Sequence, residues 1–259
     1  MTGETLSAES IMDGLDTRMI GQRILYYPSI TSTNEIAKTE AGRGIQEGTV
    51  IVADQQTAGR GRLKRSWLTP AGNIAVSIVL YPEKQILPSL VMMASLAVSH
   101  SIGTVTGLKT QIKWPNDVLI DGRKVCGILI ESDIRKEKIH YAVIGIGINV
   151  NTGEDVLSGI QTPATSLLLE AGTEVSRLLL TRELLKAMDN LYYTVISGGS
   201  VFSEWRDRLV TLGEEVRVTS GEEIFEGIAE SVDADGSLLV RSPDGSLNKV
   251  IAGDVTLRR

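Results

Sequence analysis

The sequence predicts an α+β protein: a large domain of strands and helices, followed by a small C-terminal β-barrel. Apolar, β-branched runs and helical segments share the chain as far as about residue 211. From Gly213 the runs become short and strand-like throughout. The 259 residues are enough for one large domain and one small one. We therefore expect a tail or short helix at 1–22, the large domain at 23–211 and the small domain at 212–259.

The elements of the large domain follow from their apolar patterns. Strands are expected at 23–27, 48–54, 73–81, 111–114, 118–120, 124–131 and 138–150. Helices are expected after a polar turn at 28–34 and as far as about residue 41, and at about 88–105, 164–171, 181–196 and 202–210. Ser32, Thr33 or Asn34 can cap the first of them. The segment 88–105 has an almost continuous apolar surface, which predicts a buried helix.

The C-terminal segment is divided by turn signals. Short apolar runs from Gly213 onward are separated by Ser220-Gly221, Asp235-Gly236 and Asp244-Gly245. Asp-Gly pairs between apolar runs are strong hairpin signals. Five short strands in fewer than 50 residues indicate a small β-barrel.

Composition narrows the class of protein. The net charge of −6 and the pI near 5.1 argue against a general nucleic-acid binder, which is usually basic. The one cysteine, Cys126, excludes an intramolecular disulfide and fits a reducing cytosol. His100 and His140 share no metal-ligand spacing, so we expect no protein metal site. The sequence has no signal-peptide or membrane-spanning pattern, and a soluble, cytoplasmic protein is expected.

The segment 55–67, QQTAGRGRLKRSW, carries the strongest local signal. Gly59 and Gly61 let the backbone approach a ligand closely. Guanidinium groups can grip phosphate or carboxylate with two hydrogen bonds. The segment therefore fits an anion-binding lid after a strand, and the alternative is a solvated basic turn. Its four cations lie within six residues: Arg60, Arg62, Lys64 and Arg65.

Several motifs follow one another in a specific order. They are STN at 32–34, the segment 55–67, KWPND at 113–117, GRKVCGIL at 122–129 and GIGINVN at 145–151. From about Arg23 to the C-terminus, this set resembles the biotin protein ligases. The resemblance implies a catalytic domain like that of class II aminoacyl-tRNA synthetases and biotin ligases, with a mixed sheet carrying helices on one face. It also implies an SH3-like C-terminal domain.

The resemblance implies two half-reactions and a set of site residues. Biotin and ATP form biotinyl-5′-AMP, and a lysine of a biotin carboxyl carrier domain then takes the biotinyl group. ATP would act with Mg²⁺ and biotin as substrate, without a tightly bound prosthetic group. The implied catalytic residues are Lys124 and Arg62. The implied biotin-binding residues are Ser32, Thr33, Asn34, Gln56, Gly59, Arg60, Gly61, Arg62, Lys124 and Gly127. Those implied for the nucleotide are Arg62, Trp67, Lys113, Asn116, Asp117 and Asn149.

The implied chemistry is consistent with these residue types. A carboxylate that attacks an α-phosphate brings two anions together, and cations such as Lys124 and Arg62 reduce that repulsion. Magnesium bound through the triphosphate would share the task. The alternative interpretation of Lys124 is a lysine at a hairpin edge, and Asn116 with Asp117 can form a simple Asx turn.

Bifunctional members of the family carry an N-terminal DNA-binding domain. About 22 residues before the first expected strand are too few for such a domain, so we expect the monofunctional type. The expected protein partner is the carrier domain, with no nucleic acid and no membrane. Relatives often form dimers by pairing sheet edges, and a homodimer is one of the expected states of this protein.

Two other functions are kept as alternatives. A lipoate or octanoate ligase or transferase would share the catalytic fold, and the transferases use a cysteine thioester, for which Cys126 is the candidate. The flanking apolar strand instead predicts that Cys126 is a small hydrophobic residue. A non-catalytic biotin-binding regulator would bind biotin without releasing pyrophosphate.

Overall fold

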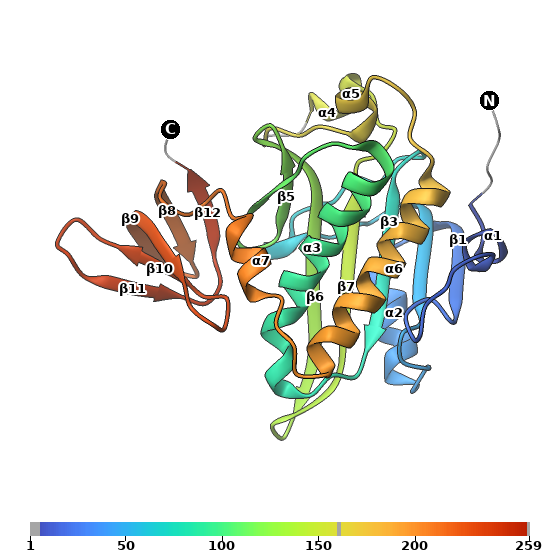
Figure 1. Cartoon of the computed structure of the whole chain (residues 1–259), viewed down its shortest axis with the longest axis horizontal. Coiled ribbons are helices and arrows are strands. Elements are labelled where there is room, and N and C mark those ends of the chain that lie inside the picture. Colours follow the sequence, from blue (N-terminus) through green and yellow to red (C-terminus); the bar gives the residue numbers. More distant parts are fainter. Residues whose placement is uncertain (1–5, 160–161, 258–259) are drawn as a thin grey trace.

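The computed structural model describes residues 6–159 and 162–257. A seven-stranded sheet forms the centre of the large domain, in the order β1-β2-β3-β7-β6-β5-β4 (Figure 1). The pair β1–β2 is parallel and the other pairs are antiparallel, so the sheet is mixed, as predicted. The strands are β1 (Ile24–Ile30), β2 (Val50–Gln56), β3 (Ile74–Leu80), β4 (Gln111–Lys113), β5 (Asp117–Ile120), β6 (Arg123–Arg135) and β7 (Lys138–Ile148).

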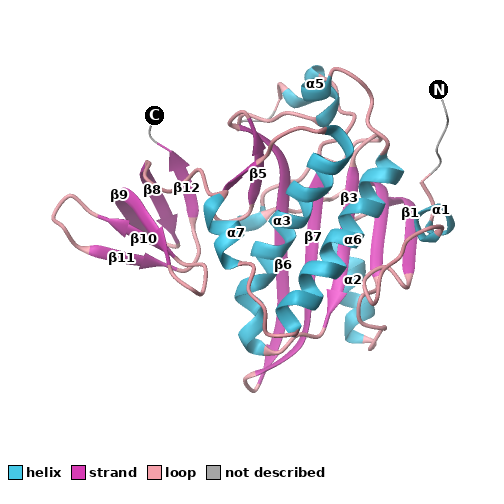
Figure 2. Cartoon of the chain, in the orientation of Figure 1, coloured by secondary structure: helices cyan, strands magenta, loops and turns pink. Residues whose placement is uncertain are grey.

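Helices cover both faces of this sheet, whereas the resemblance implied helices on one face. The long helices α3 (Leu87–Thr106) and α6 (Arg177–Ile196) lie side by side on one face (Figure 2). The shorter α2 (Thr33–Gly42) packs on the other. Strand side chains alternate between faces, so a separate small core forms under α2. It contains Ala37, Ala41, Ile45, Ile51, Val79 and Val143.

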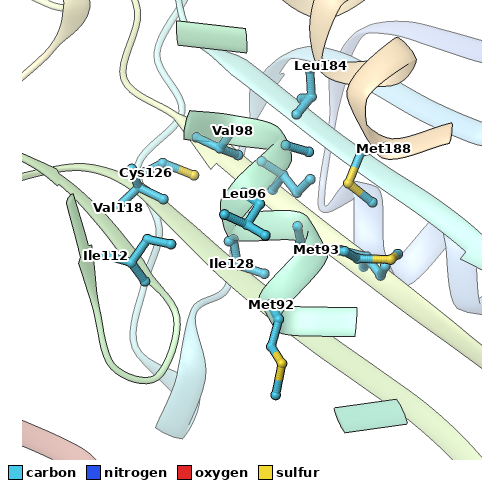
Figure 3. Packing of buried hydrophobic residues seen from close by; sticks show 14 of the residues in the cluster. Met92, Met93, Leu96, Val98, Ile112, Val118, Cys126, Ile128, Leu184 and Met188 are labelled. Atoms are coloured by element: carbon cyan, nitrogen blue, oxygen red, sulfur yellow. The ribbon is translucent and has the colours of Figure 1, made fainter. Parts of the chain in front are cut away.

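Helix α3 is the buried helix that the sequence predicts. Its side chains, such as Met93 and Leu96, pack between Ile128 of the sheet and Met188 of α6 (Figure 3). The stretch 84–106 is long and apolar enough to cross a membrane by length and composition, and 61% of an 18-residue apolar window within it is buried inside the protein. Its position in the core accounts for its apolar surface.

Strand β1 runs further than its sequence suggests. It continues through Ile30, so Pro28–Ile30 is strand, although we expected a turn from residue 28. Its pairing with β2 includes Tyr27–Ala53 and Ser29–Gln55, on either side of Pro28. Because β1 is an edge strand, the N–H that Pro28 lacks removes no bond from the interior of the sheet.

The segment before β1 is anchored to α6. It contains the short helix α1 (Ala8–Met12). The buried carboxylate of Asp189 accepts hydrogen bonds from the backbone N–H groups of Arg18, Met19 and Ile20, at 2.8, 2.8 and 2.9 Å. These bonds fix the chain where it enters the sheet.

Three short helices and a second sheet complete the fold. The helices are α4 (Glu154–Leu157), which we did not expect, α5 (Leu167–Ala171) and α7 (Phe202–Asp207). The second sheet is antiparallel, in the order β11-β10-β9-β8-β12, and forms a C-terminal domain beside β5 and α7 (Figure 1). Its strands are β8 (Glu215–Ser220), β9 (Glu223–Val232), β10 (Leu238–Arg241), β11 (Leu247–Val250) and β12 (Asp254–Leu257).

A buried tryptophan joins the two domains. Trp114 of the KWPND motif donates from its indole Nε1 to the carbonyl of Gly236, at 2.8 Å. Its backbone N–H donates to Thr211 Oγ1 at 2.9 Å. Only 2% of Trp114 is exposed. This residue is therefore a packing anchor between the large domain and the C-terminal domain.

Candidate active site

Three glycines leave part of the sheet face on the side of α2 without side chains. Gly127 of β6 pairs with Gly147 of β7, and Gly145 lies two residues before Gly147 on the same face. A Cβ at Gly145 would lie 2.2 Å from Asn34 Oδ1, and a Cβ at Gly147 would lie 2.2 Å from Trp67 Nε1. Neither contact is sterically possible, so only glycine lets α2 and Trp67 approach the strands this closely. We call this surface the glycine floor.

Lys124 reaches the glycine floor because β6 contains a bulge. Asp117 of β5 pairs with Gly127, but Leu119 pairs with Lys124, and the register shifts between the two pairs. The extra residue turns Lys124 to the same face as Gly127. Lys124 Nζ lies 2.6 Å from Asp117 Oδ1 and 5.3 Å from the centroid of the Trp67 ring. Both members of the ion pair are about one quarter exposed.

A hydrogen-bonded network borders the other end of the floor. Ser77 Oγ of β3 lies 2.8 Å from Thr33 Oγ1 and 2.6 Å from Asn34 Oδ1. The backbone N–H and the hydroxyl of Thr33 donate to Gln56 Oε1 at 2.8 and 3.1 Å. Asn34 Nδ2 donates to Glu131 Oε2 at 2.8 Å. The orientations of the predicted biotin residues Thr33, Asn34 and Gln56 are thereby fixed. Ser32 is also buried, at the start of α2, but its side chain makes no capping bond there.

The connection between β2 and β3, residues 57–73, folds back over the floor; we call it the Gly/Arg loop. The N–H of Trp67 donates to the carbonyl of Gly59 at 2.9 Å, and a Cβ at Gly59 would lie 2.4 Å from the carbonyl oxygen of Trp67. The N–H of Gly61 donates to the carbonyl of Arg65 at 2.8 Å. These internal bonds bring Trp67 onto the floor, where its ring meets Gly147.

Two arginines of the Gly/Arg loop contact different neighbours. Arg60 is exposed and forms an ion pair of 3.1 Å with Glu35 of α2. The guanidinium of Arg62 turns inward and donates to Asn116 Oδ1 at 2.9 Å and to the carbonyl of Gly253 at 3.1 Å. Arg62 therefore bridges the KWPND motif and the C-terminal domain.

The predicted nucleotide side is rich in half-buried cations. Burial lowers the pKa of Arg62 and of Lys113 below their usual ranges, and Asp117 and Asp254 oppose that shift in both residues. Lys124 pairs with the same Asp117. Cations in such surroundings gain by binding an anion, because it replaces the water that burial has removed.

The asparagines predicted for the nucleotide mainly hold the backbone. Asn116 Nδ2 donates to the carbonyl of Ile128 at 2.7 Å. Asn149 is buried, and its Nδ2 donates to the carbonyl of Thr165 at 3.0 Å. Thr165 in turn donates its N–H to the carbonyl of Lys124 at 2.9 Å. Asn149 thus supports the strand end that carries Lys124, and its role toward a nucleotide stays a prediction.

Cys126 lies on the opposite face of β6, in the core between the sheet and α3 (Figure 3). The side chain is fully buried, and burial raises the pKa of its thiol far above the usual range. A cysteine nucleophile must be a thiolate with access to its substrate. Cys126 satisfies neither condition, in agreement with its predicted role as a small hydrophobic residue.

Sequence reasoning missed three contributors to this site. Ser77 is the one hydroxyl residue inside the apolar strand β3, and that signal was visible in the sequence. Glu131 and Asp254 gave no such signal, because each reaches the site through contacts with residues distant in the chain, Asn34 and Arg65.

Known proteins resemble this chain over almost its whole length. Residues 26–149 match the Biotin/lipoate A/B protein ligase family, and residues 211–258 match the Biotin protein ligase C terminal domain. A bifunctional ligase/repressor BirA of Bacillus spizizenii is 35% identical over 258 residues, which cover 97% of this chain and 79% of that protein. A biotin–[acetyl-CoA-carboxylase] ligase of Paracoccus denitrificans is 33% identical, over 78% and 88% of the two chains.

Solved structures agree with the sequence comparisons. A biotin protein ligase from Aquifex aeolicus in complex with biotin and ATP superposes with a TM-score of 0.75 and is 28% identical. The match covers 92% of this chain and 99% of that one.

Proposed function

The chain belongs to the biotin protein ligases, and on that premise we propose how its residues join biotin to a carrier lysine with ATP. The observation that carries the proposal is the position of Lys124, Arg62 and Lys113. These three cations gather at one end of a glycine floor, and a hydrogen-bonded network closes the other end.

In the first half-reaction, a carboxylate oxygen of biotin attacks the α-phosphorus of ATP. The bond between the α-phosphorus and the bridging oxygen breaks, and pyrophosphate leaves with that electron pair. Lys124 lies beside the floor and would offset the negative charge shared by the two reactants. Arg62 and Lys113 would bind the phosphates from the side of the C-terminal domain.

Magnesium would enter with the triphosphate. No group of three or more His, Cys, Asp or Glu side chains in the described residues could hold a metal ion by itself. The ion would neutralise phosphate oxygens that the cations leave free. Asp117 pairs with Lys124 at 2.6 Å. Once the phosphates pair with that lysine, the carboxylate of Asp117 would be free to bind the magnesium ion.

The bicyclic ring of biotin would lie on the glycine floor. Its ureido group offers one carbonyl acceptor and two N–H donors, which suit the hydroxyl of Thr33 and the amide of Gln56. Trp67 occupies the space above Gly147. The Gly/Arg loop would therefore have to shift so that Trp67 and the biotin ring both fit on the glycine floor.

In the second half-reaction, the amine of a carrier lysine attacks the acyl carbon of biotinyl-5′-AMP. The bond between that carbon and the phosphate oxygen breaks, AMP leaves with that electron pair, and the amine gives its proton to solvent water as the amide forms. No protein nucleophile takes part, which agrees with the burial of Cys126. The acyl-adenylate is sensitive to water, so a loop over the site protects it.

Pyrophosphate release in the presence of biotin, octanoate or lipoate tests the proposal. We expect pyrophosphate release with biotin and ATP, followed by transfer of labelled biotin to a carrier domain. Pretreatment with iodoacetamide should leave both unchanged. Release with octanoate or lipoate in preference to biotin would favour the other branch of the family, and biotin binding without release would indicate a regulator.

A further inference from the structure

Gly253, just before β12, and Asp254, its first residue, hold the Gly/Arg loop. The carbonyl of Gly253 accepts the hydrogen bond from Arg62, and the carboxylate of Asp254 forms an ion pair with Arg65. The partners are 191 and 189 positions apart in the chain. The loop over the site is therefore attached to the C-terminal domain by two separate arginines.

The attachment points on the C-terminal domain are rigid. Asp254 pairs with Thr219 of β8, within the antiparallel ladder of β8 and β12. A Cβ at Gly253 would lie 2.8 Å from the carbonyl oxygen of Thr219, so the backbone there is packed closely against β8. The loop is also held by the contacts of Arg60 with Glu35 and of Arg62 with Asn116, but Leu63 at its tip is 66% exposed.

The charge of Asp254 also reaches the cations of the site. It opposes the burial-induced fall in the pKa of both Arg62 and Lys113. In the structure the acid therefore pairs directly with one loop arginine and compensates part of the charge of two predicted phosphate ligands. A residue with these contacts can hold the Gly/Arg loop over the site before ATP binds.

We propose that Asp254 is a positioning residue for the ligase reaction. Through Arg65, with the carbonyl of Gly253 holding Arg62, it keeps the Gly/Arg loop closed over the site, so that the acyl-adenylate is retained until the carrier lysine arrives. The identity of the retained ligand, the acyl-adenylate, rests on the proposed function. The closure of the loop by Asp254 does not. No contact of Asp254 with substrate is required.

The expected effects follow from the exposure of the pair. Arg65 is 65% exposed and Asp254 is 26% exposed. An ion pair of this exposure shifts an equilibrium by up to about fivefold. Loss of the carboxylate should therefore increase the open fraction of the loop, and with it the rate of adenylate release, by about two- to fivefold.

The first measurement is cleavage of the ligand-free protein by chymotrypsin, which can cut at Leu63 and Trp67. Cleavage should be faster in Asp254→Asn and in Arg65→Ala, and the double variant should be no faster than either single one. Arg65→Ala changes the loop alone, so it remains informative if the C-terminal variant folds poorly. Asp244→Asn is the matched control, because that carboxylate bonds to Ser246 within its own turn.

The second measurement is the release of radiolabelled biotinyl-5′-AMP from a complex formed with biotin and ATP. The same variants should release it faster, and Arg65→Lys should restore most of the retention. Unchanged cleavage and release in Asp254→Asn, or additive effects in the double variant, would overturn the proposal. If the wild-type protein forms no adenylate, the proposed function fails, and the cleavage data still decide whether Asp254 holds the loop.

Discussion

Replacing Lys124 with glutamine separates catalysis from stability. The change removes a unit charge and keeps a side chain of similar size at the edge of the glycine floor. Lys124 Nζ loses its 2.6 Å ion pair with Asp117 and its position above Trp67. The two effects of the substitution, on folding and on the reaction, have different expected sizes.

The effect on folding should be small. The ion pair of Lys124 and Asp117 is about one quarter exposed at both ends, and pairs near the surface contribute about 1 kcal/mol or less. The effect on adenylation should be large, because two unit charges 4 Å apart interact by about 4 kcal/mol at an effective dielectric constant of about 20. Loss of one preorganised charge-stabilising group costs a rate factor of about 10² to 10³.

Pyrophosphate release and the thermal midpoint should therefore respond differently. We expect Lys124→Gln to lower kcat by about two to three orders of magnitude, and to move the thermal midpoint by only a few degrees. Lys186→Gln is the matched control, since Lys186 forms an ion pair with Glu183 on the outer surface of α6. Pyrophosphate release within threefold of the wild type would refute the role of Lys124.

Three further predictions follow from buried contacts. Asp189→Ala should lower the free energy of unfolding in urea by about 2–4 kcal/mol, because it leaves the backbone donors of Met19 and Ile20 without their acceptor; a loss below 1 kcal/mol would contradict this. Burial raises the pKa of Tyr192, so its neutral form stabilises the fold below about pH 10 and that stability is lost as pH rises further. Tyr192→Phe should accordingly make the alkaline fall in thermal midpoint shallower. Gly147→Ala should displace Trp67 and shift its fluorescence to longer wavelength, and an unchanged spectrum would show that the ring does not lie on the floor.

Much of the fold could be predicted because its signals are local. Apolar, β-branched runs indicated β2, β3 and β7, and the continuous apolar surface of 88–105 indicated the central helix. The end of β1 was wrong because Pro28 is a turn signal in most contexts, and only the sheet order shows that this strand lies at an edge. The four residues of α4 are too short for periodicity to reveal.

The site was less predictable because its geometry depends on distant contacts. Motif order identified Lys124, but the bulge that turns it toward Gly127 depends on pairing with β5. The position of Trp67 on Gly147 depends on how the Gly/Arg loop folds back. Asp254 had no local signal at all, since its contact with Arg65 exists only when the two domains are packed together.

The attachment of the Gly/Arg loop to β12 has a consequence for protein synthesis. The floor, α2 and the loop leave the ribosome long before Gly253, which lies 191 positions after Arg62. Domains generally fold in order from the N-terminus as the chain emerges. A nascent chain could therefore fold its large domain, and even bind substrates, while the loop still lacked its anchor. Acyl-adenylate formed at that stage would be released faster than from the complete protein, so we expect a chain to label its carrier more efficiently once translation has passed β12.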